Sequence, residues 1–170
     1  MSDIKVNEIK TDTIKNQAGT SAITIASNGI MTTSQYIQQN GVPRFSARNG
    51  GTQSSTGPFV LQFTVADVNV GNCYNTSNYR FTAPVAGDYY FFYSVMSGGA
   101  NYVRSRLRKN GSTYIGAETF HEAETYARTS YASIFTLAAA DYVEVIVDTS
   151  GNDQGPIHPG YRQFTGFLVG

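Results

Sequence analysis

The sequence predicts an all-β fold, a sandwich or jelly roll built from short antiparallel strands. After residue 42, apolar segments bounded by turn residues recur roughly every ten to twelve residues, a spacing typical of such folds. The composition agrees, because the 170 residues include 12 Tyr, 10 Phe and 17 Gly but no Trp. Aromatic residues favour strands and Gly favours turns. Hydrophobic residues make up 41% of the chain, which is enough for a packed core.

The charge balance excludes several classes of function. The chain carries 12 basic and 12 acidic residues, so it has no long-range field to gather phosphate, and no nucleic-acid partner is expected.

No apolar run reaches about 18 residues, so no membrane insertion is expected. The first ten residues lack the apolar region of a signal peptide, and the single cysteine, Cys73, excludes an internal disulfide framework. These features predict a protein made in a reducing cytoplasm.

Two regions differ in pattern, residues 1–41 and residues 42–170. The first has isolated aliphatic residues among Asn, Thr, Ser and Lys, and it cannot bury a core of its own. The alternating residues 23–25 predict a strand, and Ser27-Asn28-Gly29 predicts a turn after it. We expect an extended β arm that is ordered against a partner. The candidate attachment residues of this arm are Ile4, Val6, Ile9 and Ile14.

The second region contains the strands of the predicted sandwich. The segment 59–65 places four apolar side chains on one face. Residues 103–109 form a strand that ends at Asn110-Gly111, a strong hairpin signal. Residues 117–127 are readable as a helix or as an edge strand and loop. Further strands are expected at 88–96, 129–137, 142–148 and 164–169.

The strand 88–96 predicts self-association. It is apolar on both faces, whereas an antiparallel strand with one wet face alternates apolar and polar residues. One face fills the core, and the other needs a cover, because a soluble monomer rarely exposes such a strip. A neighbouring subunit is the favoured cover, and the N-terminal segment of the same chain is the alternative. The predicted subunit interface consists of Tyr90, Phe92, Met96 and Phe167.

Several motifs occur in a characteristic order between residues 63 and 95. They are Asn69-x-Gly71-x-x-Tyr74, Phe81-Thr82-Ala83-Pro84 and Gly87-x-Tyr89-x-Phe91-x-Tyr93. Together with segments 107–112, 133–147 and 164–169, they resemble the C1q-like globular domain of the C1q and tumour necrosis factor superfamily. The resemblance covers residues 42–170. It implies a C1q/TNF-like jelly roll of ten strands that forms tight homotrimers and acts in binding rather than catalysis. Ala140-Asp141 departs from the Gly-Asp that the family usually has at this turn.

The N-terminal segment resembles the opening segments of bacteriophage tail-fibre and virion structural proteins. The two resemblances together suggest a trimeric virion structural protein, made in the host cytoplasm, whose arm attaches to the particle and whose C1q-like domain projects as a knob. It would be a tail-fibre or receptor-binding protein, or a capsid decoration or cement protein. The expected partners are two further copies of the chain, other virion proteins and, as a candidate, a host cell-surface glycan. The alternative is a bacterial C1q-like or lectin-like carbohydrate-binding protein.

No catalytic residue, metal or cofactor is predicted, and the protein is not expected to be an enzyme. Residues 121–125, His-Glu-Ala-Glu-Thr, begin like a zinc protease motif but lack its second histidine. No nucleophile elbow, P-loop or CxxC pair occurs. A glycoside hydrolase needs paired carboxylates, for which Glu118, Glu122 and Glu124 are the only dense acidic residues, so this hypothesis is the least favoured.

Two features remain as candidate binding elements. The long loop 148–163 is of the kind that carries recognition on a rigid sandwich. Arg104, Arg106 and Arg108 alternate along one strand, so they share a basic face that would meet an anionic glycan or a partner carboxylate, or would be a solvated face or an inter-subunit salt bridge. The candidate ligand residues of the loop are Asn152, Asp153, His158, Tyr161 and Arg162.

Overall fold

The computed structural model describes residues 13–15, 21–25, 31–33, 41–53, 57–98, 102–122, 126–149 and 157–170. The chain divides into two compact units, Met1–Asn40 and Gly41–Gly170. Within the first unit, strands β1 (Thr13–Lys15), β2 (Ser21–Ile25) and β3 (Met31–Thr33) pair antiparallel into a small sheet. Of the candidate attachment residues, Ile14 lies in β1, and Ile4, Val6 and Ile9 lie outside the described residues. Their role in attachment stays a prediction.

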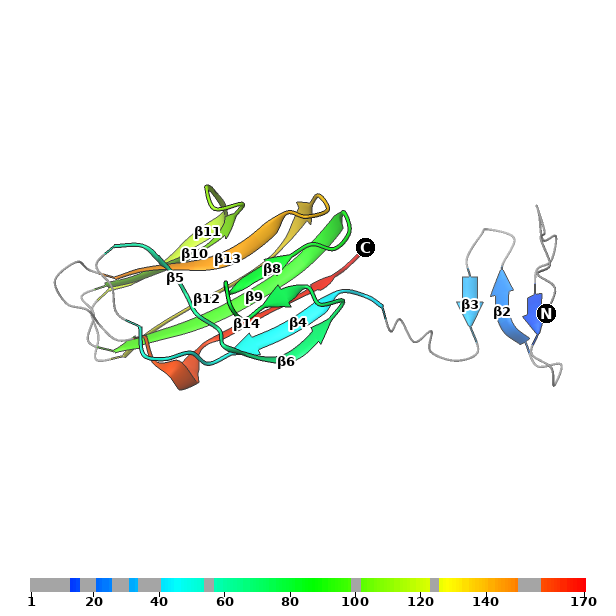
Figure 1. Ribbon diagram of the computed structural model, residues 1–170. Coiled ribbons are helices and arrows are strands. Elements are labelled where there is room, and N and C mark those ends of the chain that lie inside the picture. Colours follow the sequence, from blue (N-terminus) through cyan, green and yellow to red (C-terminus); the bar gives the residue numbers. More distant parts are fainter. Residues whose placement is uncertain are drawn as a thin grey trace. The chain divides into compact units, whose positions relative to one another are not determined.

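The second unit consists of two antiparallel sheets, seen as two layers in Figure 1. The six-stranded sheet comprises β11 (Thr113–Glu122), β10 (Tyr102–Lys109), β13 (Tyr142–Thr149), β8 (Arg80–Thr82) and β7 (Tyr74–Asn75), with β5 (Phe59–Val60) paired to β13. The five-stranded sheet runs in the order β12 (Tyr126–Leu137), β9 (Gly87–Gly98), β14 (Gln163–Leu168), β4 (Arg44–Arg48) and β6 (Val65–Val70). A 3-10 turn, η1 (Pro159–Tyr161), precedes β14. The predicted all-β jelly roll is confirmed.

One local prediction needs correction. The single strand expected at 59–65 is divided, because β5 pairs with β13 in one sheet while β6 pairs with β4 in the other. The chain crosses between the sheets at Leu61 and Phe63, which are fully buried, whereas Val65 is exposed. For residues 117–127 the edge-strand alternative is confirmed, because they contribute to the edge strand β11 and to β12 and form no helix among the described residues. At residues 59–65, pairing with distant strands outweighs the local pattern.

The core between the two sheets is an aromatic cluster. Phe45 of β4 stacks on Tyr74 at a ring-centroid distance of 4.9 Å and meets Phe164 edge-on at 4.8 Å. Phe91 of β9 packs against Phe164 at 5.9 Å. Gly166 lies beneath these rings, and a Cβ atom there would approach Phe91 Cδ1 to 2.6 Å. A side chain at Gly166 would therefore displace the cluster that joins the sheets.

No helix among the residues that the structure describes is long and apolar enough to cross a membrane.

Candidate functional site

The outer face of the five-stranded sheet divides into two halves. The strand register places Ile134, Tyr90 and Phe167 side by side across β12, β9 and β14, and the next row contains Ala132 and Phe92. We call these five residues the apolar half. Ile134 is 53% exposed and Phe167 is 42% exposed, and the rings of Tyr90 and Phe167 lie 5.1 Å apart. The apolar half is thus a continuous, uncovered surface of the kind that binds another protein surface.

The structure brings together three of the four predicted interface residues. Tyr90, Phe92 and Phe167 lie in the two adjacent rows of the apolar half. Met96 projects from the same face of β9, two rows beyond Phe92, beside Arg128 of β12. Their common orientation follows from the period of two along a strand.

The second half of the face is hollowed by two adjoining pockets of about 370 and 580 Å³ that share Arg128 and Tyr161. Among the described residues, neither pocket is lined by an acidic side chain. We call this second half the arginine groove. It shares Phe92 with the apolar half. Its other lining residues are Arg48, Ser94, Met96, Tyr126, Arg128, His158, Gly160, Tyr161, Arg162 and Gln163.

Backbone contacts fix the wall of the arginine groove. Ile157 forms isolated bridges to both Gln53 and Ser97, and its N–H donates to the carbonyl of Gln53 at 2.9 Å. The N–H of His158 donates to the carbonyl of Met96 at 3.0 Å. The 3-10 turn η1 follows and places Tyr161 over the face. The loop therefore presents His158 and Tyr161 from a backbone tied to β9.

Arg162 differs in position from the other loop candidates. Its side chain is only 3% exposed, and its Nη atoms donate to Gln53 Oε1 at 2.6 Å and to the carbonyl of Gly51. Burial lowers the pKa of Arg162 to about 10. The guanidinium therefore braces the loop against residues 51–53, and Arg162 also lines one of the two pockets, so its role in binding a ligand stays a prediction. Asn152 and Asp153 lie outside the described residues.

The groove combines exposed rings with an exposed arginine. Tyr126 and Tyr161 are 59% and 56% exposed, and the ring of His158 lies 5.5 Å from Tyr126 and 6.2 Å from Tyr161. Arg48 donates to Asp67 at 2.7 Å. Arg128 is exposed and has no ion pair within the described part of the chain. A guanidinium without a carboxylate is available to an external anion.

The outer face of the six-stranded sheet differs from that of the five-stranded sheet. The arginines of β10 lie on one face as predicted, but they form ion pairs with carboxylates of neighbouring strands in the same sheet. Arg106 pairs with Glu118 at 2.8 Å, and Arg108 pairs at 2.7 Å with Glu144, whose side chain is fully buried. Arg106 also covers the ring of Tyr114, with 3.6 Å between its Cζ atom and the ring centroid. The ion pairs are therefore intramolecular.

The C1q domain family matches residues 44–169, which is most of the chain. This protein belongs to the C1q domain family. The globular domain of the zebrafish complement 1qA protein is 22% identical, with a TM-score of 0.65, and the match covers 76% of this chain and 98% of that one.

Murine APRIL shares the fold of this C1q domain as well. Its structure at pH 8.5 is 12% identical with a TM-score of 0.59, and its structure at pH 8.0 is 10% identical with a TM-score of 0.61. Both matches cover 75% of this chain and 99% of the other. The suspected C1q and tumour necrosis factor resemblance is thus confirmed at the level of family and fold.

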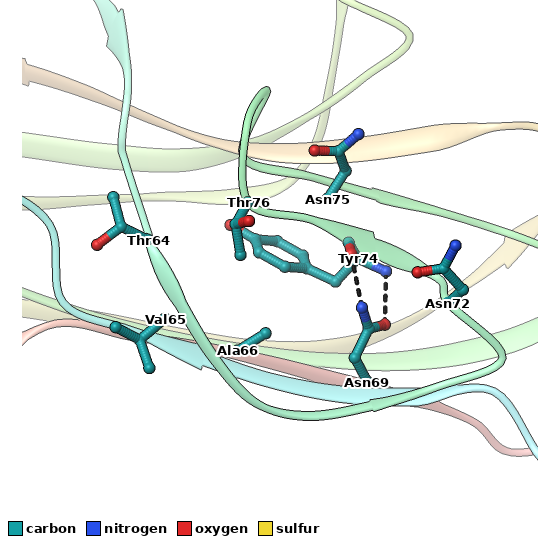
Figure 2. A pocket seen from close by; sticks show the side chains of 8 residues that line it. All are labelled: Thr64, Val65, Ala66, Asn69, Asn72, Tyr74, Asn75 and Thr76. Carbon is teal, nitrogen blue, oxygen red and sulfur yellow. Dashed lines mark hydrogen bonds between the residues drawn. The ribbon is translucent and has the colours of Figure 1, made fainter.

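One sequence motif of this C1q domain has a structural explanation in Figure 2. The Asn69 side chain accepts from the N–H of Tyr74 at 3.0 Å and donates to its carbonyl at 2.8 Å. Gly71, between them, has φ +79°, a conformation that favours glycine. The pocket of about 700 Å³ beside this brace is lined by uncharged side chains. Because the Asn69 amide is used to join β6 and β7, the motif is structural.

The remaining reactive candidates of the C1q domain show no activation. Burial raises the pKa of the Cys73 thiol to about 11, so it is a thiol rather than a thiolate at neutral pH. His121 lies in β11 with its Nδ1 atom 2.7 Å from the carbonyl oxygen of Glu122. No group of three or more metal-binding side chains gathers among the described residues, and Glu124 lies outside them.

Sequence reasoning missed Tyr126, Arg128 and Arg48 as members of the site. Arg128 is one alternating residue of β12, and nothing near it in the sequence shows that Met96 is its neighbour. An available signal was the period of two in residues 126–136, which places polar and aromatic residues on one face. That alternation indicates on which face of the strand a side chain lies, but it does not indicate which strand is the neighbour.

Proposed function

We propose that this protein is a homotrimeric structural and binding protein of a bacteriophage particle. The apolar half of the five-stranded sheet is the subunit interface, and residues 1–41 are the arm that attaches to the virion. The single observation that carries the trimer is the uncovered surface around Tyr90, Ile134 and Phe167. Burying such rings between subunits contributes roughly 25 cal/mol per Å² of apolar area.

The choice of three copies rests on the C1q and tumour necrosis factor resemblance, which implies trimers. The role in a virion rests on the N-terminal segment, whose isolated aliphatic residues resemble the opening segments of tail-fibre and virion structural proteins. A rigid sandwich with a tethered surface loop suits recognition or cementing rather than catalysis. The two variants of the proposal are a tail-fibre or receptor-binding protein and a capsid decoration protein.

Light scattering of the purified full chain tests the assembly. The expected mass is three times the 18.5 kDa of one chain. A stable monomer would overturn the trimer. Mass spectrometry of purified phage particles tests the location, and absence of the chain from the particles would overturn the virion role. Immunogold labelling then assigns the protein to head or tail.

A second candidate function is a bacterial lectin-like carbohydrate-binding protein that acts outside any particle. The arginine groove favours it, because exposed tyrosine rings and an exposed guanidinium are groups that bind sugars. The particle experiment separates the two candidates, because only the virion protein is packaged. A glycan array on which the protein binds nothing would remove the second candidate.

A further inference from the structure

We propose that the pocket between β6 and β7, at the edge of the sandwich, binds an uncharged sugar. The inference rests on the binding role in the proposed function and names its ligand class. The pocket, whose lining residues Figure 2 shows, has a volume of about 700 Å³, which suits a mono- or disaccharide. We call it the edge pocket.

The edge pocket lies apart from the proposed subunit interface. It lies beside β6, the last strand of the five-stranded sheet, whereas the apolar half spans β12, β9 and β14. Strand β4 separates β14 from β6. The described lining of the edge pocket shares no residue with the apolar half or with the arginine groove. A trimer formed through the apolar half therefore leaves the edge pocket accessible.

The lining selects an uncharged ligand that forms many hydrogen bonds. Every lining side chain among the described residues is uncharged. A charged group bound there would lose water without gaining a counter-charge. Thr64 and Thr76 contribute hydroxyl groups, and Asn72 and Asn75 contribute amides. Hydroxyl and amide groups both donate and accept hydrogen bonds, as do the hydroxyl groups of a sugar.

The apolar part of the lining favours a sugar over a smaller polar molecule. Val65 and Ala66 line the pocket together with Tyr74. The Tyr74 side chain is buried, and its hydroxyl donates to the carbonyl of Phe63 at 3.2 Å, so the ring is held in place. The C–H face of a pyranose packs on apolar surface of this kind, while its hydroxyl groups reach the polar side chains around it.

The wall of the edge pocket is fixed before any ligand binds. The Asn69 side chain joins β6 to β7 through bonds of 3.0 and 2.8 Å to the backbone of Tyr74. The Asn75 side chain accepts from the N–H of Ser77 at 2.7 Å, which fixes the turn that carries Thr76. A preorganised wall lowers the entropic cost of binding.

Backbone strain in the same turn argues against an incidental hollow. Tyr79 has φ +63°, in the left-handed region that a bulky side chain rarely adopts, and its N–H donates to the carbonyl of Asn75 at 2.8 Å. Strain of this kind persists only where the surrounding structure imposes it, and it clusters at sites that bind ligands. The strained turn is the one that brings Thr76 to the pocket.

Saturation-transfer difference NMR on the full-length protein tests the proposal. The probes are the methyl β-glycosides of glucose, galactose and N-acetylglucosamine, and methyl β-glucuronide and methyl β-galacturonide are the charged matches of the first two. We expect a dissociation constant on the order of 1 mM for at least one neutral probe, and at least fivefold weaker binding of both uronides. No transfer to any neutral probe, or a uronide that binds as tightly as the best of them, would overturn the inference.

Matched threonine variants locate the site. Thr64→Val and Thr76→Val each remove one hydroxyl with little change in side-chain volume, and each is expected to weaken binding of the neutral sugar about fivefold. The control Thr113→Val makes the same change at an exposed position of β11, at the opposite edge of the six-stranded sheet, and should leave binding unchanged. Unchanged binding in both pocket variants, or an equal loss in the control, would overturn the assignment to the edge pocket.

Light scattering on the same samples separates this inference from the proposed function. A wild-type monomer whose sugar binding is weakened by Thr76→Val would contradict the trimer and support the edge pocket. A trimer that binds none of the neutral probes would contradict the edge pocket alone. If Thr76→Val dissociates the trimer, the edge pocket belongs to the subunit interface and the inference is overturned.

Discussion

The two outer faces of the sandwich use their aromatic and charged residues in different ways. On the six-stranded sheet, Arg106 lies over Tyr114, and Arg108 forms an ion pair with Glu144. These charged side chains are therefore paired within the same chain. On the five-stranded sheet, Ile134 and Phe167 are uncovered, and Arg128 has no acidic partner among the described residues. The difference teaches that exposed aromatic residues alone do not mark an interface. What distinguishes the proposed interface is that its aromatic and charged side chains lack such partners among the described residues.

The largest expected effect comes from a charge placed in the apolar half. Tyr90→Asp buries a carboxylate against the neighbouring subunit, so we expect the trimer to dissociate to chains of 18.5 kDa. Light scattering measures the mass. The matched control is Phe120→Asp, because Phe120 is 51% exposed on the opposite face. Dissociation by the control, or an unchanged mass for Tyr90→Asp, would contradict the proposed interface.

The next effect concerns the ion pairs on the outer face of the six-stranded sheet. Glu144→Gln removes the charge that Arg80 and Arg108 bind at 2.9 and 2.7 Å. We expect a loss of about 2 kcal/mol in the free energy of unfolding, less than for a fully buried pair because both arginines keep some contact with water. Urea unfolding at one protein concentration measures it. Glu118→Gln, on an exposed pair, should cost less than about 1 kcal/mol. Equal losses would show that burial of Glu144 has no special role.

A stabilising change is available in the turn that links the two sheets. Ala140 has φ +70°, in the region that favours glycine, at the position where the family usually has Gly. Ala140→Gly should raise the free energy of unfolding by about 1 kcal/mol. Thermal unfolding detects this as an increased Tm. The neighbouring Ala139, whose φ is not positive, supplies the control, because Ala139→Gly should lower the Tm slightly.

The smallest effect is a dependence on pH at the same turn. Hydrogen bonds from Lys109, then Asn110 and the Ala138 N–H, lower the pKa of Asp141 from 3.8 to about 2. Because the folded-state pKa is lower than the unfolded one, the contribution is present above about pH 4 and is lost as pH falls toward 2. The Tm difference between the wild type and Asp141→Asn should therefore narrow between pH 5 and pH 2. A constant difference would contradict this assignment.

Much of the fold was predictable because its signals are local. The alternation in 88–96 correctly predicted that Tyr89, Phe91 and Tyr93 lie in the core. Asn110-Gly111 correctly predicted the hairpin between β10 and β11, where both residues have positive φ. The division of 59–65 between two sheets was not predictable, because the same alternation fits a continuous strand and a crossing segment.

The candidate site was only partly predictable. Tyr90, Phe92 and Phe167 were found because each belongs to a strand with apolar residues on both faces. His158 and Tyr161 were singled out from their loop, but the burial of Arg162 depends on contacts with Gly51 and Gln53, more than a hundred residues away. No local pattern encodes such a contact.

The sequence by itself determined the all-β class, the position of most strands and, within those strands, the alternation of side chains between two faces, because these follow from a period of two and from turn residues. Only the tertiary structure decided which strands are neighbours. The pairing of β9 with β12 and β14 sets Tyr90 beside Ile134 and Phe167, and Met96 beside Arg128. Hydrogen-bonded pairing between distant segments depends on topology and shared core packing, and these are properties of the folded chain as a whole.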